Sequence, residues 1–135
     1  MPQTITLSAK AQVEAAKRAI KEYTAAEAIE LAKRPDMVLV DVRDPRELER
    51  EGRIPGALHC PRGMLEFWID PASPYFKPVF AADNTFVFFC ASGMRSALAT
   101  KTAQDMGLKP VANIIGGFGA WKQAGGPVER LDAKS

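Results

Sequence analysis

The chain has 135 residues, of which 47% are hydrophobic, and its formal net charge at pH 7 is +2. This length and composition suit one compact domain with a hydrophobic core. The 18 basic residues are spread along the chain, so we expect no nucleic acid as a partner. No apolar stretch approaches the length of a membrane span, and the first residues lack the order of a signal peptide. We therefore expect a cytoplasmic protein with no membrane partner.

The first third of the chain predicts helices followed by a strand. Apolar side chains recur at helical spacing in residues 8–34, which we expect to form two helices. The second helix is predicted to begin at a capping box formed by Thr24 and Glu27. The valine-rich run of residues 37–42 predicts a buried strand, and Asp44-Pro45-Arg46-Glu47 then has the residue order of a helix N-terminus.

Strands and helices alternate in the rest of the chain. We expect strands at residues 57–60, 85–89 and 111–115, and helices at residues 96–106 and from 117 to about 124. Residues 85–89 are apolar throughout, which predicts a central strand that is covered on both faces. The alternation predicts an α/β fold, a three-layer sandwich in which helices flank a mainly parallel sheet.

A single cysteine, Cys90, follows the apolar strand and precedes a loop of small residues that ends in an arginine and a helical pattern. Cysteine reacts as its thiolate, and inward-turned amides at the positive end of a helix stabilise an anion. We therefore interpret Cys90 as a nucleophile in an anion-binding loop that contains no acidic residue. The residues assigned to the loop are Ala91, Ser92, Gly93, Met94, Arg95 and Ser96. The alternative, a buried and inert Cys90, does not account for the glycine and the arginine.

Arg95 and the pair Asp41 and Arg43 each have two interpretations. Arg95 either binds an oxyanion of the substrate or, as we favour, braces the loop through backbone carbonyls and a carboxylate such as Asp41 or Glu47. Asp41 and Arg43 alternate at the end of a strand, so we expect them to point to opposite faces, where one could approach and support the loop. A structural ion pair is the alternative that we favour for these two residues.

The second cysteine, Cys60, follows the only histidine, His59. A disulfide between Cys60 and Cys90 is disfavoured because nothing in the chain suggests export. We expect Cys60 to be buried and inert, and the alternative is that it resolves an oxidised Cys90. We expect His59 to be structural rather than a base for Cys90. Two cysteines and one histidine make a poor zinc site, so no metal is expected.

Residues 62–84 follow no clear periodicity and combine aromatic residues with prolines. The aromatic residues include Phe67, Trp68, Tyr75 and Phe76. They favour additional core beneath a long loop, and a lid beside the reactive cysteine or a docking surface is the alternative. Later in the chain, Trp121 is expected to anchor the last helix in the core, and Gly116 and Gly117 are expected to form a tight turn rather than to bind phosphate.

Four motifs follow one another along the chain: Val38-Leu39-Val40-Asp41-Val42-Arg43-Asp44, Gly52-Arg53-Ile54-Pro55-Gly56-Ala57, Cys90-Ala91-Ser92-Gly93-Met94-Arg95-Ser96 and Gly116-Gly117-Phe118-Gly119-Ala120-Trp121. In order and spacing they resemble the rhodanese family of sulfurtransferases over roughly residues 23–128. The resemblance implies a single rhodanese domain, which we place at residues 23–130, between a helical extension at residues 1–22 and a tail at residues 131–135. Arg53 stands where the family often has a histidine.

The resemblance also implies an activity. Cys90 would accept a sulfane sulfur as a persulfide from a donor such as thiosulfate and pass it to cyanide, a small thiol or a protein thiol. No cofactor is expected. The alternative from another class is a module without broad turnover: a persulfide carrier for one protein, a redox sensor or a protein-binding domain.

Two further questions stay open at the level of the sequence. A thiol phosphatase or arsenate reductase is less favoured, because those enzymes place five residues between cysteine and arginine, whereas Ala91-Ser92-Gly93-Met94 is all that separates Cys90 from Arg95. The alanine-rich segment of residues 8–23 could pack on its own domain or on a second copy, so a homodimer is one of the expected assemblies.

Overall fold

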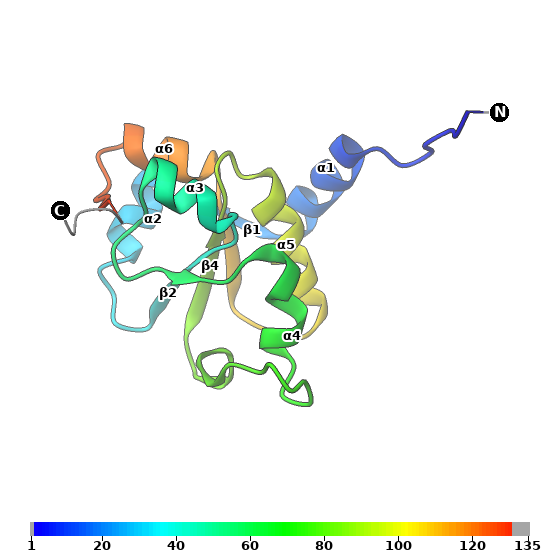
Figure 1. Ribbon diagram of the computed structural model, residues 1–135. Coiled ribbons are helices and arrows are strands. Elements are labelled where there is room, and N and C mark those ends of the chain that lie inside the picture. The colour runs from blue at the N-terminus through cyan, green and yellow to red at the C-terminus, as the bar shows by residue number, and fades with distance from the viewer. Residues whose placement is uncertain (1, 131–135) are drawn as a thin grey trace.

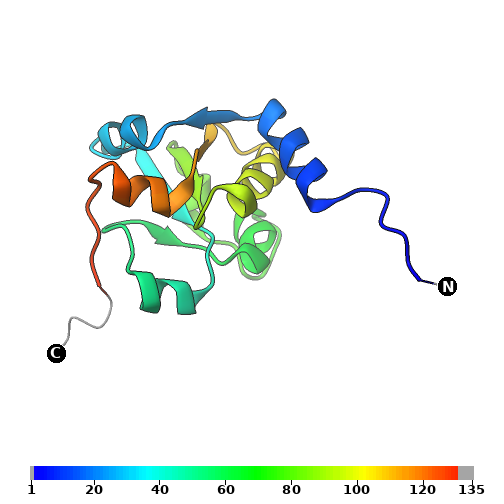
Figure 2. The same ribbon diagram turned by 90° about the horizontal axis from the view of Figure 1, so that it is seen from above.

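A five-stranded parallel sheet lies between two layers of helices (Figure 1 and Figure 2), and the structure, a computed structural model, describes residues 2–130. The strands are β1 (Lys21–Tyr23), β2 (Met37–Asp41), β3 (Leu58–His59), β4 (Thr85–Phe89) and β5 (Val111–Ile114). The helices are α1 (Ala9–Ala19), α2 (Ala25–Leu31), α3 (Pro45–Glu51), α4 (Leu65–Ile69), α5 (Met94–Asp105) and α6 (Gly117–Gln123), with short 3-10 helices η1 (Arg62–Met64) and η2 (Pro78–Ala81). The strand order is β1-β5-β4-β2-β3. The predicted α/β sandwich is therefore confirmed.

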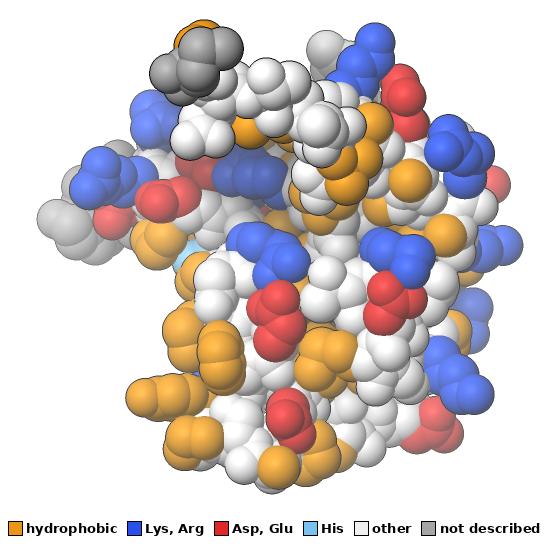
Figure 3. Space-filling model, turned by 90° about the vertical axis from the view of Figure 1, so that its right-hand side faces the viewer, with side chains coloured by type: hydrophobic (Ala, Val, Ile, Leu, Met, Phe, Trp, Pro, Cys, Tyr) orange, Lys and Arg blue, Asp and Glu red, His pale blue; other side chains and the backbone are white. Residues whose placement is uncertain are grey.

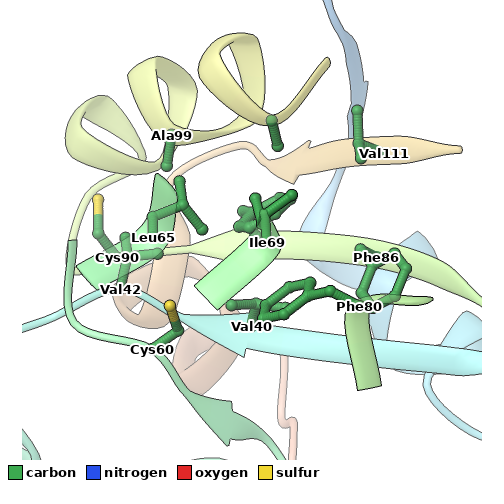
Figure 4. Packing of buried hydrophobic residues seen from close by; sticks show 12 residues of the cluster. Val40, Val42, Cys60, Leu65, Ile69, Phe80, Phe86, Cys90, Ala99 and Val111 are labelled. Carbon is green, nitrogen blue, oxygen red and sulfur yellow. The ribbon is translucent and has the colours of Figure 1, made fainter. Parts of the chain in front are cut away.

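The central strand β4 is covered on both faces. Successive side chains of a strand point to opposite sides of the sheet. Phe86 and Phe88 belong to the hydrophobic cluster under α4 and α5, which Figure 4 shows, whereas Val87 and Phe89 belong to the cluster under α2 and α6. Trp121 of α6 is buried in the second cluster, as predicted. This burial explains why residues 86–89 show no polar position.

The region before β2 differs from the prediction in one element. A strand, β1, separates α1 from α2 and pairs in parallel with β5 at the edge of the sheet. The wholly helical assignment of residues 8–34 is therefore wrong at Lys21–Tyr23. A three-residue strand is too short to show a period of two, and helical patterns flank it on both sides. The division into an extension and a domain at residue 23 stays a prediction, and the tail expected at residues 131–135 lies outside the described residues.

Most other boundaries agree with the sequence. The capping boxes at Thr24 and Asp44 are both present and begin α2 and α3. The strand predicted at residues 57–60 is shorter than expected, and α5 begins at Met94 instead of Ser96. The earlier start follows from Gly93, which has a φ of 96° and occupies the N-cap position of α5.

Residues 62–84 form η1, α4, η2 and the turns between them. Trp68 packs against the cluster under α4 and α5, as the core prediction requires. Phe67 and Tyr75 remain 51% and 57% exposed, so the core prediction is wrong for these two side chains. Phe76 is half-buried.

Helix α1 packs on the outer side of α5 through Val13, Ala16 and Ala97. Figure 3 shows this side of the molecule, where basic and acidic side chains alternate with hydrophobic ones instead of forming a field of one sign. Among residues 2–130, no helix is long and apolar enough to cross a membrane.

Candidate active site

Cys90 lies directly after β4, at the carboxyl end of the central strand. Ligand sites in parallel sheets lie beyond these strand ends. The loop that follows, residues 90–95, is called the reactive loop below. Gly93 in this loop leaves little room for a side chain, because a Cβ there would lie 3.1 Å from the backbone nitrogen of Gly116. The loop therefore packs closely against the turn between β5 and α6.

The first turn of α6 holds the reactive loop from the other side. The amides of Phe118 and Gly119 donate to the carbonyl oxygens of Cys90 and Ala91 at 2.8 and 3.1 Å. Gly117 has a φ of 59°, and a Cβ on it would overlap the Cys90 carbonyl oxygen. The glycine pair, predicted only to form a tight turn, therefore also sets the position of the loop.

The sulfur of Cys90 lies among hydrogen-bond donors. The Gly93 amide is 3.2 Å from Sγ, and the Ser96 amide and hydroxyl oxygen are each 3.4 Å from it. Burial by itself would raise the pKa of the Cys90 thiol, but the contact with the Ser96 hydroxyl and hydrogen bonds from the amides of Ser96, Ser92 and Gly93 bring that pKa below its ordinary value. The arrangement favours a thiolate in an otherwise apolar interior.

The remaining loop residues form an exposed rim over the buried sulfur. Ala91, Ser92, Met94 and Arg95 are exposed, whereas Cys90 has no exposed surface. A cavity of about 260 Å³ lies beside the rim, and Arg95 and Arg62 both line it. Asp44 lines the same cavity, and Arg62 and Arg95 are paired with Glu66 and Glu47, so the wall carries charges of both signs.

Arg95 joins α5 to α3 through a bidentate ion pair. Its two terminal nitrogens donate to the two carboxylate oxygens of Glu47 at 2.8 and 2.9 Å. This hydrogen bonding lowers the pKa of Glu47 to about 2 and raises that of Arg95. Glu47 is one of the two carboxylates predicted as bracing partners. The contact fits the favoured bracing interpretation, while the role of Arg95 in turnover stays a prediction.

Asp41 and Arg43 form a buried ion pair. The Arg43 guanidinium donates to the Asp41 carboxylate at 2.8 Å and to the Gly52 carbonyl oxygen at 3.0 Å, and its Cζ lies 4.1 Å from the centre of the Phe118 ring. The prediction that the two side chains point to opposite faces is wrong, because residues two positions apart along an extended chain share a face. The favoured alternative, a structural ion pair, is present. Support of the reactive loop by this pair stays a prediction.

Cys60 and His59 contact backbone oxygens rather than the Cys90 sulfur. Cys60 Sγ lies 3.9 Å from the Pro61 carbonyl oxygen, and burial raises the pKa of this thiol to about 12. His59 Nε2 lies 2.8 Å from the Arg43 carbonyl oxygen. Both cysteines are free. Within residues 2–130, no group of three or more histidine, cysteine, aspartate or glutamate side chains could hold a metal ion.

One polar residue at the site has no role in the sequence analysis. Asn113, fully buried in β5, places its Oδ1 atom 2.6 Å from the Ser96 hydroxyl. The signal that could have found it is a single amide within the apolar run of residues 111–115. A buried amide in a strand needs partners, and in a parallel sheet its neighbours come from distant parts of the chain.

The family model described as rhodanese-like domain matches residues 24–124. The chain belongs to this rhodanese-like domain family. A curated relative, the thiosulfate sulfurtransferase GlpE of Coxiella burnetii, is 34% identical over 102 residues, which is 76% of this chain and 87% of that protein. The predicted resemblance is therefore confirmed.

Two solved structures are similar over nearly the whole rhodanese-like chain. One is a protein of unknown function from Rhodopseudomonas palustris, described as a possible tyrosine phosphatase, with 64% identity, a TM-score of 0.93 and coverage of 96% of this chain and 99% of that chain. The other is the polysulfide-sulfur transferase homodimer of Wolinella succinogenes, with 34% identity, a TM-score of 0.69 and coverage of 93% and 89%.

Proposed function

We propose that the protein is a sulfurtransferase that moves a sulfane sulfur from a donor such as thiosulfate, through a persulfide on Cys90, to a thiophilic acceptor. The observation that carries the proposal is the Cys90 sulfur, which accepts hydrogen bonds from the Gly93 and Ser96 amides at the start of α5. A persulfide sulfur, like a thiolate, is an anion that such donors stabilise. The thiosulfate sulfurtransferase of Coxiella burnetii supports the same class of donor.

The proposed reaction has two steps. The Cys90 thiolate attacks the outer sulfur of thiosulfate, a sulfur–sulfur bond forms on Cys90, and sulfite leaves with the electron pair of the bond that breaks. An acceptor such as cyanide then attacks the outer sulfur of the persulfide, which forms thiocyanate and returns the Cys90 thiolate. A small thiol or a protein thiolate accepts the sulfur in the same way. The covalent intermediate implies ping-pong kinetics.

Access to the sulfur requires a small movement. Cys90 has no exposed surface, whereas Ala91 and Ser92 above it are exposed. The donor must therefore displace part of this rim or the Arg95 side chain before its sulfur reaches Sγ. Arg95 and Arg62, which line the neighbouring cavity and are paired with Glu47 and Glu66, would be the nearest cations to the anionic donor.

The test is the intact mass of the protein after incubation with thiosulfate. We expect wild-type protein and a Cys60→Ser variant to gain one sulfur atom that cyanide removes, and a Cys90→Ser variant to gain none. No gain in a folded wild-type protein whose Cys90 still titrates would refute thiosulfate as the donor. A gain of one sulfur atom by Cys90→Ser, but not by Cys60→Ser, would assign the sulfur to Cys60 and overturn the proposal.

A persulfide carrier for one protein partner is the second candidate. The exposed side chains of Phe67 and Tyr75 favour it, because large aromatic residues on the surface commonly mark protein contacts. A carrier would load one sulfur from thiosulfate but show no steady-state production of thiocyanate. Turnover with thiosulfate and cyanide would favour the enzyme with small-molecule acceptors.

Phosphatase activity is suggested only by the description of the Rhodopseudomonas palustris protein. The reactive loop holds Ala91-Ser92-Gly93-Met94 between Cys90 and Arg95, one residue fewer than the thiol phosphatases have. We expect no hydrolysis of an aryl phosphate under conditions in which the sulfur is loaded.

A homodimer, the assembly of the Wolinella succinogenes protein, is tested by the solution mass of the full chain with and without residues 1–22.

A further inference from the structure

A chain of hydrogen bonds leads from the Cys90 sulfur to the N-terminal helix α1. Ser96 Oγ lies 3.4 Å from Cys90 Sγ and 2.6 Å from Asn113 Oδ1. Asn113 Nδ2 donates to Glu22 Oε2 at 2.9 Å, and the same oxygen pairs with Lys17 Nζ at 2.9 Å. Ser96 and Asn113 have no exposed surface, so water does not compete for the inner bonds.

The orientation of the Asn113 amide decides where the Ser96 proton goes. Nδ2 lies beside two atoms that only accept, Glu22 Oε2 at 2.9 Å and the Gly93 carbonyl oxygen at 3.3 Å. The amide oxygen therefore faces Ser96. Because this oxygen has no proton to donate, the Ser96 hydroxyl donates its single proton to it.

Cys90 Sγ and Asn113 Oδ1 thus compete for the single hydroxyl proton of Ser96. When Cys90 is a neutral thiol, the hydroxyl bonds Asn113 and can accept the thiol proton. When Cys90 is a thiolate, the hydroxyl can stabilise that charge only by leaving Asn113 Oδ1 without its 2.6 Å bond. The Gly93 and Ser96 amides have no such alternative partner at the sulfur.

We propose that Asn113 is a positioning residue for Cys90, which withholds the Ser96 proton from the sulfur, and that Glu22 and Lys17 hold Asn113 in this orientation. The inference rests on the proposed sulfurtransferase function for its purpose, since a thiolate whose charge is less fully stabilised is the stronger nucleophile. Lys17 and Glu22 both precede residues 24–124, the part that matches the family model. The α1–β1 segment would therefore help to orient Asn113 beside the Cys90 sulfur.

The charged groups around this chain are few. Glu22 comes from β1 and Lys17 from α1, and they neutralise each other. Arg95 comes from α5 and is paired with Glu47 of α3. Because each charge has a partner of opposite sign, we expect the effect of Asn113 on the sulfur to pass through the hydrogen bonds rather than through a long-range field.

The first experiment measures the ultraviolet absorbance of the Cys90 thiolate against pH. Each variant is compared with the same variant carrying Cys90→Ser, which removes the signals of tyrosine and of Cys60. Asn113→Val is expected to move the titration to lower pH and to raise the thiolate fraction below the midpoint about three- to tenfold, the net size of one typical hydrogen bond. In a Ser96→Ala background, Asn113→Val is expected to have no effect.

Glu22→Gln is the second variant, because a buried Asn113→Val protein could fail to fold. It keeps the size of the side chain on the edge strand and is expected to give a smaller change in the same direction, about twofold, that also disappears with Ser96→Ala. Glu30→Gln, which removes a carboxylate from the exposed pair with Lys33, is the matched control and is expected to change nothing.

Two results would overturn the inference. One is a titration that stays in place or moves to higher pH in Asn113→Val, or in Glu22→Gln where Asn113→Val does not fold. The other is an effect of the same size with and without Ser96→Ala, which would show a field or packing effect instead of competition for the hydroxyl. The absorbance needs no sulfur donor, so a failure of the sulfurtransferase proposal, seen as no gain of mass, is read separately.

Discussion

Cys60 and Cys90 lie at the same end of the sheet (Figure 4), and neither has any exposed surface. They differ in the polarity of the groups around the sulfur. Cys60 Sγ donates to the Pro61 carbonyl oxygen, which favours the neutral thiol, whereas Cys90 Sγ accepts from the Gly93 and Ser96 amides, which favours the thiolate. Burial raises the pKa of the Cys60 thiol to about 12. At Cys90, hydrogen bonds outweigh burial, and the pKa of that thiol is lowered. Both thiols are buried, so the polarity of their hydrogen-bond partners distinguishes them.

The sequence after each cysteine explains the difference. Cys60 is followed by Pro61, which has no amide proton to offer the sulfur. Cys90 is followed by a loop whose Gly93 turns the chain into α5, so that free amides at the start of the helix converge on the sulfur.

The largest effect is expected from substitution of Cys90 itself. Cys90→Ser should lower the rate of sulfur transfer from thiosulfate to cyanide by about a thousandfold or more, because it removes the nucleophile. Steady-state thiocyanate formation measures this. Comparable rates in Cys90→Ser and wild-type protein would show that Cys90 is not the nucleophile.

Gly117→Ala should displace the reactive loop. The new Cβ would overlap the Cys90 carbonyl oxygen, so we expect the rate of sulfur transfer to fall about a hundredfold, as misplacement of a reacting atom does. Gly125→Ala is the matched control: Gly125 also has a positive φ, 85°, but a Cβ there meets nothing within 4 Å. Both variants should lose about 1–2 kcal/mol of unfolding free energy through the left-handed backbone, and Gly117→Ala should lose more because its Cβ also overlaps the reactive loop. Equal loss of activity in the two variants would show that backbone strain, rather than loop position, is responsible.

Arg95→Ala should lower both stability and turnover. The pair of Arg95 and Glu47 is bidentate but half open to solvent, so its loss is expected to reduce the unfolding free energy by about 1 kcal/mol. A loosened loop should reduce the rate about tenfold. Chemical denaturation and steady-state kinetics measure the two effects. If stability is unchanged and only the KM for thiosulfate rises, Arg95 binds the donor and does not brace the loop.

Glu47→Gln tests the ion pair of Arg95 and Glu47 through the pH dependence of the unfolding free energy. The folded protein lowers the pKa of Glu47 from 4.5 to about 2, so the stabilisation is complete above pH 4.5 and is lost as the pH falls toward 2. The glutamine variant keeps a side chain that can accept from the Asp44 amide of the capping box. We expect its unfolding free energy to fall less steeply than that of wild-type protein across this range. Parallel acid profiles would show that the ion pair adds nothing to folding.

What the sequence predicts well in this protein is local. The capping boxes at Thr24 and Asp44, the apolar β4 and the acid-free loop after Cys90 each depend on residues that are close together in the chain. The parts that escape prediction depend on distant partners. Asn113 bonds Glu22 across 91 positions, and β1 is recognisable as a strand only through its pairing with β5. A sequence pattern reports periodicity, not which buried polar groups meet across the sheet.

The smallest effect on activity is expected from Cys60→Ala. Cys60 is packed in the hydrophobic cluster under α4 and α5, so removal of its sulfur should reduce the unfolding free energy by about 1 kcal/mol. Because its thiol stays protonated at neutral pH, the rate of sulfur transfer should remain within about twofold of wild type. Denaturation and kinetics on the same samples separate the two effects. A loss of activity as large as that of Cys90→Ser would show that Cys60 takes part in the reaction. The hydrogen bond to a carbonyl oxygen would then not be enough to keep a buried thiol out of sulfur transfer.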